Sequence, residues 1–352
     1  MDIHKKHMHR CIQIGKNALG SARPNPMVGC VIVHDEHIIG EGFTSAYGGN
    51  HAEVNAVNSV KDKSLLKEAS LYVTLEPCSH FGKTPPCSDM IIRNQIPKVF
   101  IGTIDTHSKV AGRGIEKLKK AGCDVTVGVL EDECRKHHKR FFTYHNKKRP
   151  YIILKWAQTQ DGFIAPEKSS ERAPVWITNS NSRQLVHKWR AEEQAILVGN
   201  KTVIEDNPKL TTRDWSGHHP VRVLIDLSNK TPIDSSILDK TVKTIVITSK
   251  NNINKNSSNL IYETIEPGKQ ITTDICRILH KHEIQSVIIE GGSFTIQSFI
   301  DKNLWDEARI FKGITNFSKG TIAPKIHGKL TSSEKILNDT LSIYINDHNN
   351  HF

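Results

Sequence analysis

His51-Ala52-Glu53 and, after a gap, Pro77-Cys78-Ser79-His80-Phe81-Gly82-Lys83-Thr84-Pro85-Pro86-Cys87 are the residues of this 352-residue chain around which the rest is organised. One His and two Cys supply three ligands of the kind that zinc prefers. Three protein ligands leave the fourth tetrahedral position open for water, as in catalytic rather than structural zinc sites. Bound zinc lowers the pKa of such a water toward neutrality. We therefore predict a catalytic zinc site made by His51, Cys78 and Cys87.

A carboxylate lies two residues beyond the predicted histidine ligand. Glu53 is placed to carry protons without binding the metal, and His-x-Glu followed by Pro-Cys and a second Cys is the signature of zinc-dependent base deaminases. Each part is weak alone, because two cysteines at this spacing are more often unrelated thiols and His-x-Glu is common by chance. The full set in order, with a proline before the first cysteine, favours zinc. We predict that Glu53 is the catalytic acid and base.

The residues around these ligands predict a layered α/β domain. Apolar β-type runs alternate with helical patterns, with strands expected at 28–33, 37–40, 71–75, 99–102 and 125–127 and helices at 52–60, 87–93, 114–121 and 131–144. His51 and Cys87 then both lie at helix N-termini, where the helix dipole favours thiolate over thiol.

A basic run and a proline end this first pattern. Pro150 cannot continue a helix, so we place a domain boundary there, with domains at 1–147 and 148–352. The alternation restarts with expected strands at 151–156, 195–199, 221–226, 244–248 and 286–289. Glu290-Gly291-Gly292 then opens a helix, which suits an anion site, although a lone glycine pair is more often only a tight turn.

Both halves resemble one known family. The Cys78–Cys87 block, with its eight intervening residues, and Pro24-Asn25-Pro26-Met27-Val28-Gly29-Cys30 resemble the deaminase half of the bifunctional riboflavin-biosynthesis deaminase–reductase. A second set of motifs resembles the reductase half of that family. These motifs are Lys155-Trp156-Ala157, Asp161-Gly162, Trp176-Ile177-Thr178, Arg190-Ala191, Val198-Gly199, Thr202, residues 206–213 and Glu290-Gly291-Gly292. The chain departs from the family pattern at Thr44, within Thr106–Ser108 and at Pro174.

The resemblance implies a fold, two reactions and a set of binding residues. The fold is a cytidine-deaminase-like three-layer domain followed by a dihydrofolate-reductase-like domain. The reactions are zinc-dependent hydrolytic deamination of 2,5-diamino-6-(5-phosphoribosylamino)pyrimidin-4(3H)-one, then NADPH-dependent reduction of the ribosyl group of 5-amino-6-(5-phosphoribosylamino)uracil to ribityl, in a homo-oligomer. Carried over by position, the NADPH residues are Ala157, Trp176, Thr202, Asp206 and Gly292, and the residues for the phosphorylated substrate are Arg190, Leu210, Arg213 and Glu290. Two arginines suit a phosphate, because each presents a planar fork of donors.

Composition limits the partners and the compartment. No apolar run approaches the roughly 20 residues that span a bilayer, and the first 30 residues lack a signal-peptide pattern. Seven thinly spread cysteines do not make a disulfide framework, so we expect a cytoplasmic chain without a membrane partner. The formal net charge of +11 suits phosphorylated metabolites as well as nucleic acid. The densest basic run, 135–140, is better explained as the solvated face of an amphipathic helix, so we expect no nucleic-acid partner.

Two other hypotheses stay open at this point. A nucleic-acid editing deaminase fits the charge and the His-x-Glu motif, but the long cysteine spacing and the reductase-like second half argue against it. A non-catalytic structural zinc module needs a fourth protein ligand, and His80 is the only near candidate.

Overall fold

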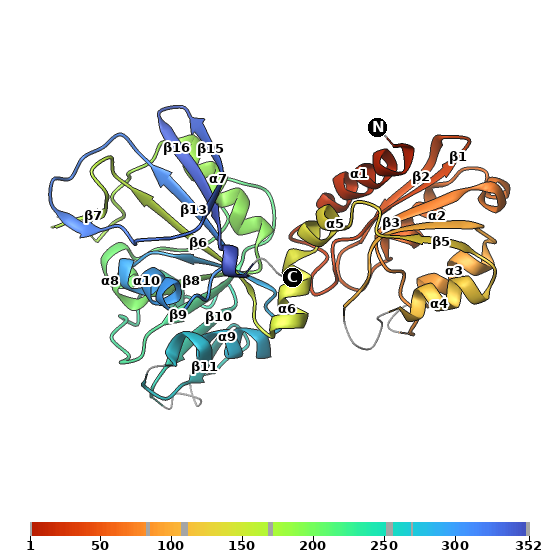
Figure 1. Ribbon diagram of the computed structural model, residues 1–352. Helices are drawn as coiled ribbons and strands as arrows, with labels where there is room; N and C mark the ends of the chain where they lie inside the picture. The colour runs from red at the N-terminus through yellow and green to blue at the C-terminus, as the bar shows by residue number, and fades with distance from the viewer. Residues whose placement is uncertain are drawn as a thin grey trace. The chain divides into compact units, whose positions relative to one another are not determined.

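The computed structural model describes residues 2–81, 85–106, 112–167, 172–250, 256–268 and 270–349. Residues 82–84 of the Cys78–Cys87 block, and two residues of the departure at Thr106–Ser108, lie outside these ranges. The chain divides into two compact units between Lys147 and Lys148, and each is described here by itself (Figure 1).

The N-terminal unit is built on a five-stranded sheet in the order β2-β1-β3-β4-β5. The hairpin β1–β2 turns at Asp35 and Glu36, whose φ values of 46° and 64° are those of a two-residue hairpin turn. β1 runs antiparallel to β2 and β3, whereas β3, β4 and β5 are parallel. The strands are β1 Gly29–His34, β2 His37–Phe43, β3 Ser70–Leu75, β4 Lys98–Thr103 and β5 Asp124–Val127.

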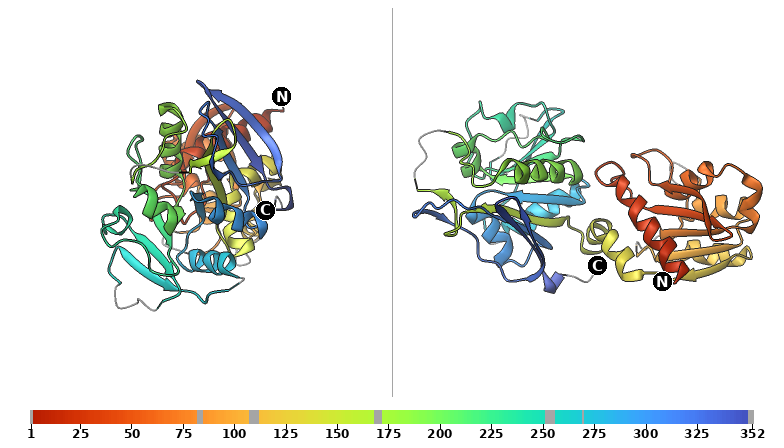
Figure 2. Two further views of the ribbon diagram at one scale, coloured as in Figure 1. Left: turned by 90° about the vertical axis from the view of Figure 1, so that its left-hand side faces the viewer. Right: turned by 90° about the horizontal axis from the view of Figure 1, so that it is seen from above.

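Helices cover both faces of this sheet, which gives three layers (Figure 2). Successive strand residues point to opposite faces, and the core divides accordingly. Val31 and Tyr72 pack with Met8 and Cys11 of α1, while Ile32 and Leu71 belong to the core cluster on the other face. The helices are α1 Ile3–Gly15, α2 Ala52–Ser59, α3 Cys87–Arg93, α4 Arg113–Lys120, α5 Glu131–His137 and α6 Lys139–Lys147, with 3₁₀ turns at Lys16–Ala18 and Lys63–Glu68.

The single helix expected at 131–144 is wrong in one respect. It is two helices, α5 and α6, that meet at His138. The His138 side chain is buried, and its Nε2 lies 3.0 Å from the Thr74 hydroxyl of β3. The break between the two helices thus coincides with a polar contact to β3. The spacing of apolar residues in the sequence gives no sign of such a contact, so the break was not predicted.

The C-terminal unit contains a nine-stranded sheet in the order β11-β10-β9-β8-β12-β6-β13-β16-β15. From β11 to β13 all neighbours are parallel, and β16 and β15 add an antiparallel edge. A separate pair is formed by β7 and β14. The strands are β6 Tyr151–Gln158, β7 Phe163–Pro166, β8 Ala195–Gly199, β9 Val221–Ile225, β10 Thr244–Thr248, β11 Leu260–Thr264, β12 Ser286–Glu290, β13 Glu307–Lys312, β14 Gly320–Ile322, β15 Lys329–Ile336 and β16 Asp339–Ile345.

The parallel strands explain where a site can form in this unit. Because they run the same way, their carboxyl ends meet at one edge of the sheet, the usual place for ligands in such folds. Glu290 ends β12, and its register partner on β6 is Lys155. The helices are α7 Ser180–Glu192, α8 Asn200–Asp206, α9 Ile271–Lys281 and α10 Ser293–Asp301, with 3₁₀ turns at Ser236–Leu238 and Asp347–Asn349.

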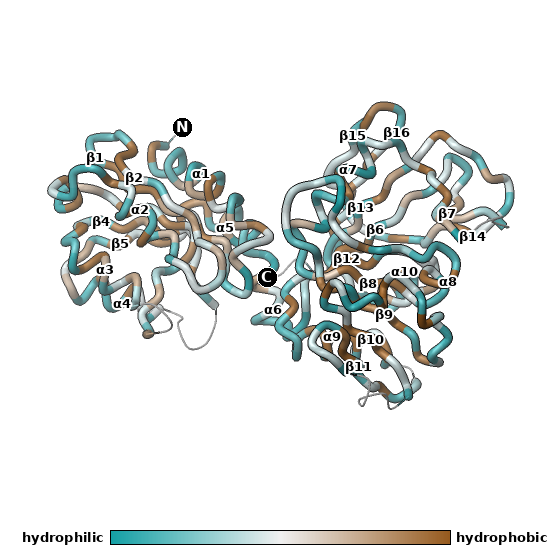
Figure 3. The backbone as a smooth tube through the Cα atoms, turned by 180° about the vertical axis from the view of Figure 1, so that it is seen from behind, coloured by the Kyte–Doolittle hydropathy of each residue, from teal (hydrophilic) through white to brown (hydrophobic). Residues whose placement is uncertain are grey.

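Burial in this unit also follows strand alternation. Leu197 and Ile289 lie in one core cluster, whereas Ile196 and Val198 lie in another. The hydrophobic colouring accordingly follows central strands such as β8 and β12 (Figure 3). None of the helices in the described ranges combines the length and the hydropathy needed to cross a bilayer.

Candidate active sites

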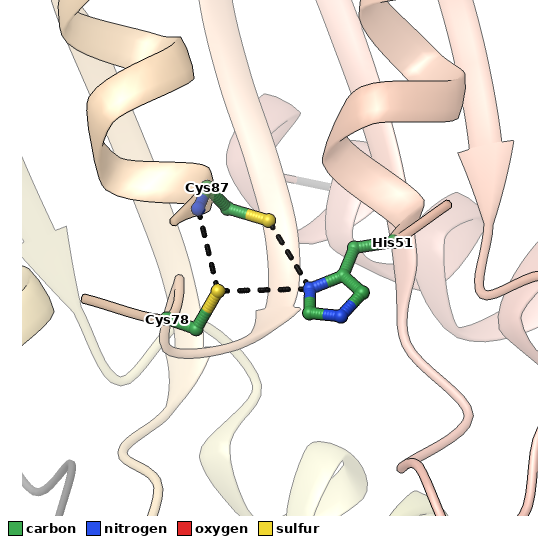
Figure 4. A group of neighbouring side chains, drawn as sticks. All are labelled: His51, Cys78 and Cys87. Atoms are coloured by element: carbon green, nitrogen blue, oxygen red, sulfur yellow. Dashed lines mark hydrogen bonds between the residues drawn. The ribbon is translucent and has the colours of Figure 1, made fainter. Parts of the chain in front are cut away.

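Three predicted ligands converge in the N-terminal unit. His51 is the residue just before α2, Cys78 follows β3, and Cys87 is the first residue of α3. Their side chains point toward one another (Figure 4), with Cys78 Sγ 3.6 Å and Cys87 Sγ 3.3 Å from His51 Nδ1. A tetrahedral zinc ion with ordinary bond lengths holds sulfur and nitrogen ligands about 3.5 Å apart. The donor atoms, all within 4.8 Å of one another, therefore fit a zinc ion.

Hydrogen bonding already favours a thiolate at this centre. The Cys87 thiol, the His51 ring and the Cys87 amide, 3.3 Å from Cys78 Sγ, together hold the pKa of Cys78 at about 4 against the opposing effect of burial. The negative sulfur of Cys78 and burial in turn raise the pKa of Cys87, and the hydrogen bond with Cys78 raises the pKa of His51. A cation at this position would favour loss of the Cys87 proton as well, so that both sulfurs could bind it as thiolates.

Glu53 lies in the first turn of α2 beside the three donors. Its side chain is only 4% exposed, and burial, reinforced by the nearby Cys78, raises its pKa to about 7. A carboxyl group with a pKa near neutrality exchanges protons readily in both directions.

The structure shows what two residues noted in the sequence, Thr44 and His80, do near this centre. Thr44, one of the departures from the family pattern, is buried, and its hydroxyl accepts a hydrogen bond from the Val28 amide at 3.0 Å. It therefore ties the end of β2 to the segment before β1. His80 is not part of the ligand group found among the described residues.

Glu76, which the sequence analysis did not single out, is also buried here. Its carboxylate accepts hydrogen bonds from the backbone amides of Gly112, Gly114 and Ile115 at the start of α4. Its place directly before Pro77-Cys78 is a signal that the sequence offers. The partners, more than 35 residues away, are not visible there.

In the C-terminal unit charged side chains gather around Glu290 at the carboxyl end of β12, where it meets Lys155 of β6 and Arg190 of α7. Glu290 Oε2 accepts a hydrogen bond from Arg190 Nη2 at 2.9 Å, and Lys155 Nζ lies 3.8 Å from Glu290 Oε1. Burial acts to raise the pKa of Glu290, but Arg190 and Lys155 outweigh it and the pKa is lowered. Burial, together with Arg190, lowers the pKa of Lys155. Within the described residues Glu290 Oε1 and Arg190 Nε are buried without a hydrogen-bond partner, so both atoms are available to hydrogen-bond a ligand.

The second predicted arginine lies near the first. Burial and then the positive charge of Arg190 lower the pKa of Arg213, a mutual repulsion that an anion between them would relieve. The Arg213 amide donates to His187 Nδ1 at 2.9 Å, so His187 on α7 holds this segment in place. Leu210 is different, because its side chain is 3% exposed and packs in a core cluster with Val198 and Val203. Lys155 and His187 were given no role in the sequence analysis.

Of the five residues predicted for NADPH, two lie side by side, and the other three are placed on separate segments of the C-terminal unit. Thr202 and Gly292 come together, because a Cβ added at Gly292 would lie 3.5 Å from the Thr202 hydroxyl. Gly292, at φ 68°, precedes α10 and opens it as expected. Ala157 lies on β6. Asp206 ends α8, with a pKa that burial raises to about 6. Trp176 is 59% exposed, with the Arg183 guanidinium 4.5 Å from its ring centre.

Comparison with known proteins identifies the family. Residues 150–341 match the family model described as RibD C-terminal domain, and residues 1–103 match the cytidine and deoxycytidylate deaminase zinc-binding region. The riboflavin biosynthesis protein RibD of Aquifex aeolicus is 40% identical over 332 residues, which are 93% of this chain and 89% of that protein. This chain belongs to the RibD family. RibD of Actinobacillus pleuropneumoniae is 38% identical over 92% of this chain and 84% of its own length.

Solved structures of the RibD family agree with this fold. The diaminohydroxyphosphoribosylaminopyrimidine deaminase/5-amino-6-(5-phosphoribosylamino)uracil reductase of Thermotoga maritima superposes with a TM-score of 0.88 at 36% identity, covering 98% of this chain and 99% of that one. RibD of Acinetobacter baumannii gives a TM-score of 0.87 at 31% identity, over 97% and 98%. The expected family and the two-domain α/β fold are confirmed, with a cytidine-deaminase-like zinc-binding domain followed by a RibD-type reductase domain.

Proposed function

We propose that this chain catalyses both reactions named for the Thermotoga maritima relative. Residues 1–147 would deaminate the diaminopyrimidine nucleotide, and residues 148–352 would reduce the ribosyl group of the product. The observation that carries the proposal is the convergence of His51 Nδ1, Cys78 Sγ and Cys87 Sγ beside the buried Glu53.

In the deaminase half, His51, Cys78 and Cys87 would hold zinc. The metal, when bound, lowers the pKa of a coordinated water and makes it a nucleophile near neutral pH. Glu53 takes one proton from the attacking water and gives it to the ring nitrogen. It then takes the second proton from the new hydroxyl group and gives it to the amino group, which leaves as ammonia. The water oxygen becomes the new carbonyl oxygen, so the reaction consumes one water and releases one ammonia. Burial of Glu53 supports this role, because a group that must both accept and donate works best with a pKa near the pH of the reaction.

In the reductase half, Arg190 and Arg213 would bind the substrate phosphate, with Leu210 shaping the segment between them. NADPH, when bound, supplies the hydride. We assign its binding to Ala157, Trp176, Thr202, Asp206 and Gly292. The glycine turn before α10 supports an anionic group of the cofactor at that helix.

Reduction at the ribose also needs a proton, and Lys155 is our candidate for the group that holds it. Lys155 is the cation 3.8 Å from Glu290, and burial, with Arg190, favours release of its proton. Glu290 would orient Lys155 and Arg190 in the cluster, because it contacts both.

The other two hypotheses are less well supported. A closed structural zinc site needs a fourth protein ligand, and His80 is absent from the ligand group among the described residues.

We propose phosphorylated pyrimidines as the substrates in preference to nucleic acid, and a homo-oligomer in the cytoplasm. The seven cysteines are unpaired, which suits a reducing compartment.

The test is a coupled assay on the purified chain with the diaminopyrimidine nucleotide, in which ammonia and NADPH oxidation are followed separately. We expect ammonia first and NADPH oxidation after it. His51→Ala should stop ammonia release yet leave NADPH oxidation intact when the deaminated nucleotide is supplied. Ammonia from tRNA or single-stranded DNA, with none from the nucleotide, would refute the proposal.

A further inference from the structure

Glu76 is a buried carboxylate whose partners are backbone amides. Oε2 accepts from the Gly112 amide at 3.0 Å, and Oε1 accepts from Gly114 at 2.9 Å and from Ile115 at 3.4 Å. The backbone of Asp105 also donates to it. Amides at a helix start are ordinarily left without partners, and a negative charge there interacts favourably with the helix dipole. Glu76 therefore acts as the N-terminal cap of α4, although it comes from a distant part of the chain.

The backbone of α4 also touches the segment that carries the metal ligand. A Cβ added at Gly114 would lie 2.0 Å from the carbonyl oxygen of Pro77, so only glycine allows the helix to come this close. Two separate features, the carboxylate of Glu76 and the bare backbone of Gly114, thus fix α4 against the two residues before Cys78.

Cys78 is held from its other side by the start of α3. The Ser88 amide donates to the Cys78 carbonyl at 3.1 Å, and the Cys87 amide lies 3.3 Å from Cys78 Sγ. The ligand segment is therefore fixed between two helix starts. If the carboxylate of Glu76 were lost, its hydrogen bonds to the start of α4 would be lost with it, whereas the α3 contacts and the bond from the Glu76 amide to the Thr103 carbonyl at 3.0 Å would remain.

We propose that Glu76 is a positioning residue of the metal centre: its carboxylate fixes the segment before Cys78 to α4 and so keeps Cys78 Sγ in ligand geometry with His51 and Cys87. It is not assigned a catalytic role, because both of its oxygens accept hydrogen bonds from backbone amides. The inference rests on the metal site proposed above.

The chemistry of the contact explains why glutamate is needed here. An ionised carboxylate has two acceptor oxygens with about four lone-pair positions, which match several amide donors. Glutamine has the same length, but its NH₂ group would face amide N–H groups and leave at least one of them without an acceptor. Aspartate keeps the charge and both oxygens but is shorter by one methylene.

The experiment measures zinc affinity by competition with a chelator of known zinc affinity, and the visible absorption of the Co²⁺-substituted protein. Outer-shell partners of metal ligands ordinarily contribute about 10- to 100-fold in metal affinity. We expect Glu76→Gln to weaken zinc binding by roughly this factor and to alter the Co²⁺ spectrum, with Glu76→Asp nearer to wild type. Asp62→Ala is the matched control, because it removes a side-chain cap from another helical turn of the same unit, where Asp62 accepts from the Ser64 amide at 3.0 Å.

The outcomes separate this inference from the proposal on which it rests. Zinc affinity and a Co²⁺ spectrum unchanged in both Glu76 variants, even with a lower melting temperature, would show a purely structural cap and overturn the inference alone. A wild-type chain that binds no zinc, or a His51→Ala variant that binds it normally, overturns the metal site and this inference with it. Weak metal binding in Asp62→Ala as well as in Glu76→Gln also overturns it, because the effect would then follow from general destabilisation.

Discussion

Acid should destabilise the N-terminal unit through His137, the last residue of α5. The ring is 7% exposed and its Nε2 lies 2.6 Å from the Met27 carbonyl oxygen, to which it donates. Burial, reinforced by Lys16 and Arg140, lowers its pKa from 6.5 to about 4. Protonation of the folded protein would place a second proton, and a charge, in this enclosed position.

The sign and size of the effect follow from proton linkage. The unfolded chain binds the proton with a pKa of 6.5, whereas the folded chain binds it only near 4. Acid therefore favours the unfolded state, and the stability contributed by a neutral His137 is complete above about pH 7 and is lost as the pH falls. The loss is about 2 kcal/mol at pH 5 and approaches about 3.4 kcal/mol well below pH 4, a large share of an ordinary folding free energy.

The distribution of residues allows each unit to be followed separately in the intact chain. All five tryptophans lie after residue 150, so their fluorescence reports on the C-terminal unit. Thiol reactivity during urea unfolding reports mainly on the N-terminal unit, which contains Cys11, Cys30, Cys78, Cys87, Cys123 and Cys134.

His137→Gln is the informative variant, because its amide can still donate to Met27 but does not titrate. With zinc saturating in both proteins, the unfolding free energy read from the thiols should fall by about 2 kcal/mol more in wild type than in the variant between pH 7.5 and 5. Equal losses in the two proteins would refute the reasoning. So would a difference that appears only in tryptophan fluorescence, because His137 belongs to the other unit.

Three further results are expected. Glu53→Gln should slow ammonia release by at least about 100-fold while zinc content and the reduction of deaminated nucleotide stay normal, and residual activity near wild type would contradict the role assigned to Glu53. His187→Phe removes the acceptor for the Arg213 amide and should raise KM for the phosphorylated reductase substrate by roughly 10-fold. His187→Asn can still accept this hydrogen bond, so its KM should stay closer to that of wild type. An equal effect of both variants would argue against positioning through this hydrogen bond. Asp306→Ala leaves the buried Arg149 without its paired carboxylate, whose oxygens lie 2.6 and 2.8 Å from the guanidinium. The unfolding free energy of the C-terminal unit, measured in urea by tryptophan fluorescence, should fall by about 3–5 kcal/mol. A loss below about 1 kcal/mol would be inconsistent with this ion pair.

Local patterns in the sequence were enough to place the predicted metal ligands on their elements. The expected helices at 52–60 and 87–93 correspond to α2 and α3, and the strand at 71–75 corresponds to β3. Each of these elements is short and has its own apolar periodicity. The ligands lie at their ends, so correct element boundaries were sufficient to predict where they fall.

The polar strand β15 near the C-terminus was not predictable in the same way. Residues 329–336 form β15, although almost every side chain in that strand is exposed. An edge strand with both faces polar has no apolar alternation to reveal it. Its pairing with β16 depends on backbone hydrogen bonds that any sequence can make.

Glu76 and Lys155 were missed for a different reason. Each belongs to a group that holds a buried carboxylate, and the two groups do so in different ways. Glu76 follows β3 and Glu290 ends β12, so each stands at the carboxyl end of a parallel strand whose register is fixed by apolar neighbours. Glu76 is held by backbone amides, whose positions depend on the fold and carry no sequence signature. Glu290 is held by Arg190 and Lys155, which lie 100 and 135 positions away and meet it only because the sheet order brings their elements together. Substitutions in the partners should therefore disturb Glu290 through charge, whereas Glu76 should respond only to changes that move the α4 backbone, such as a side chain at Gly114.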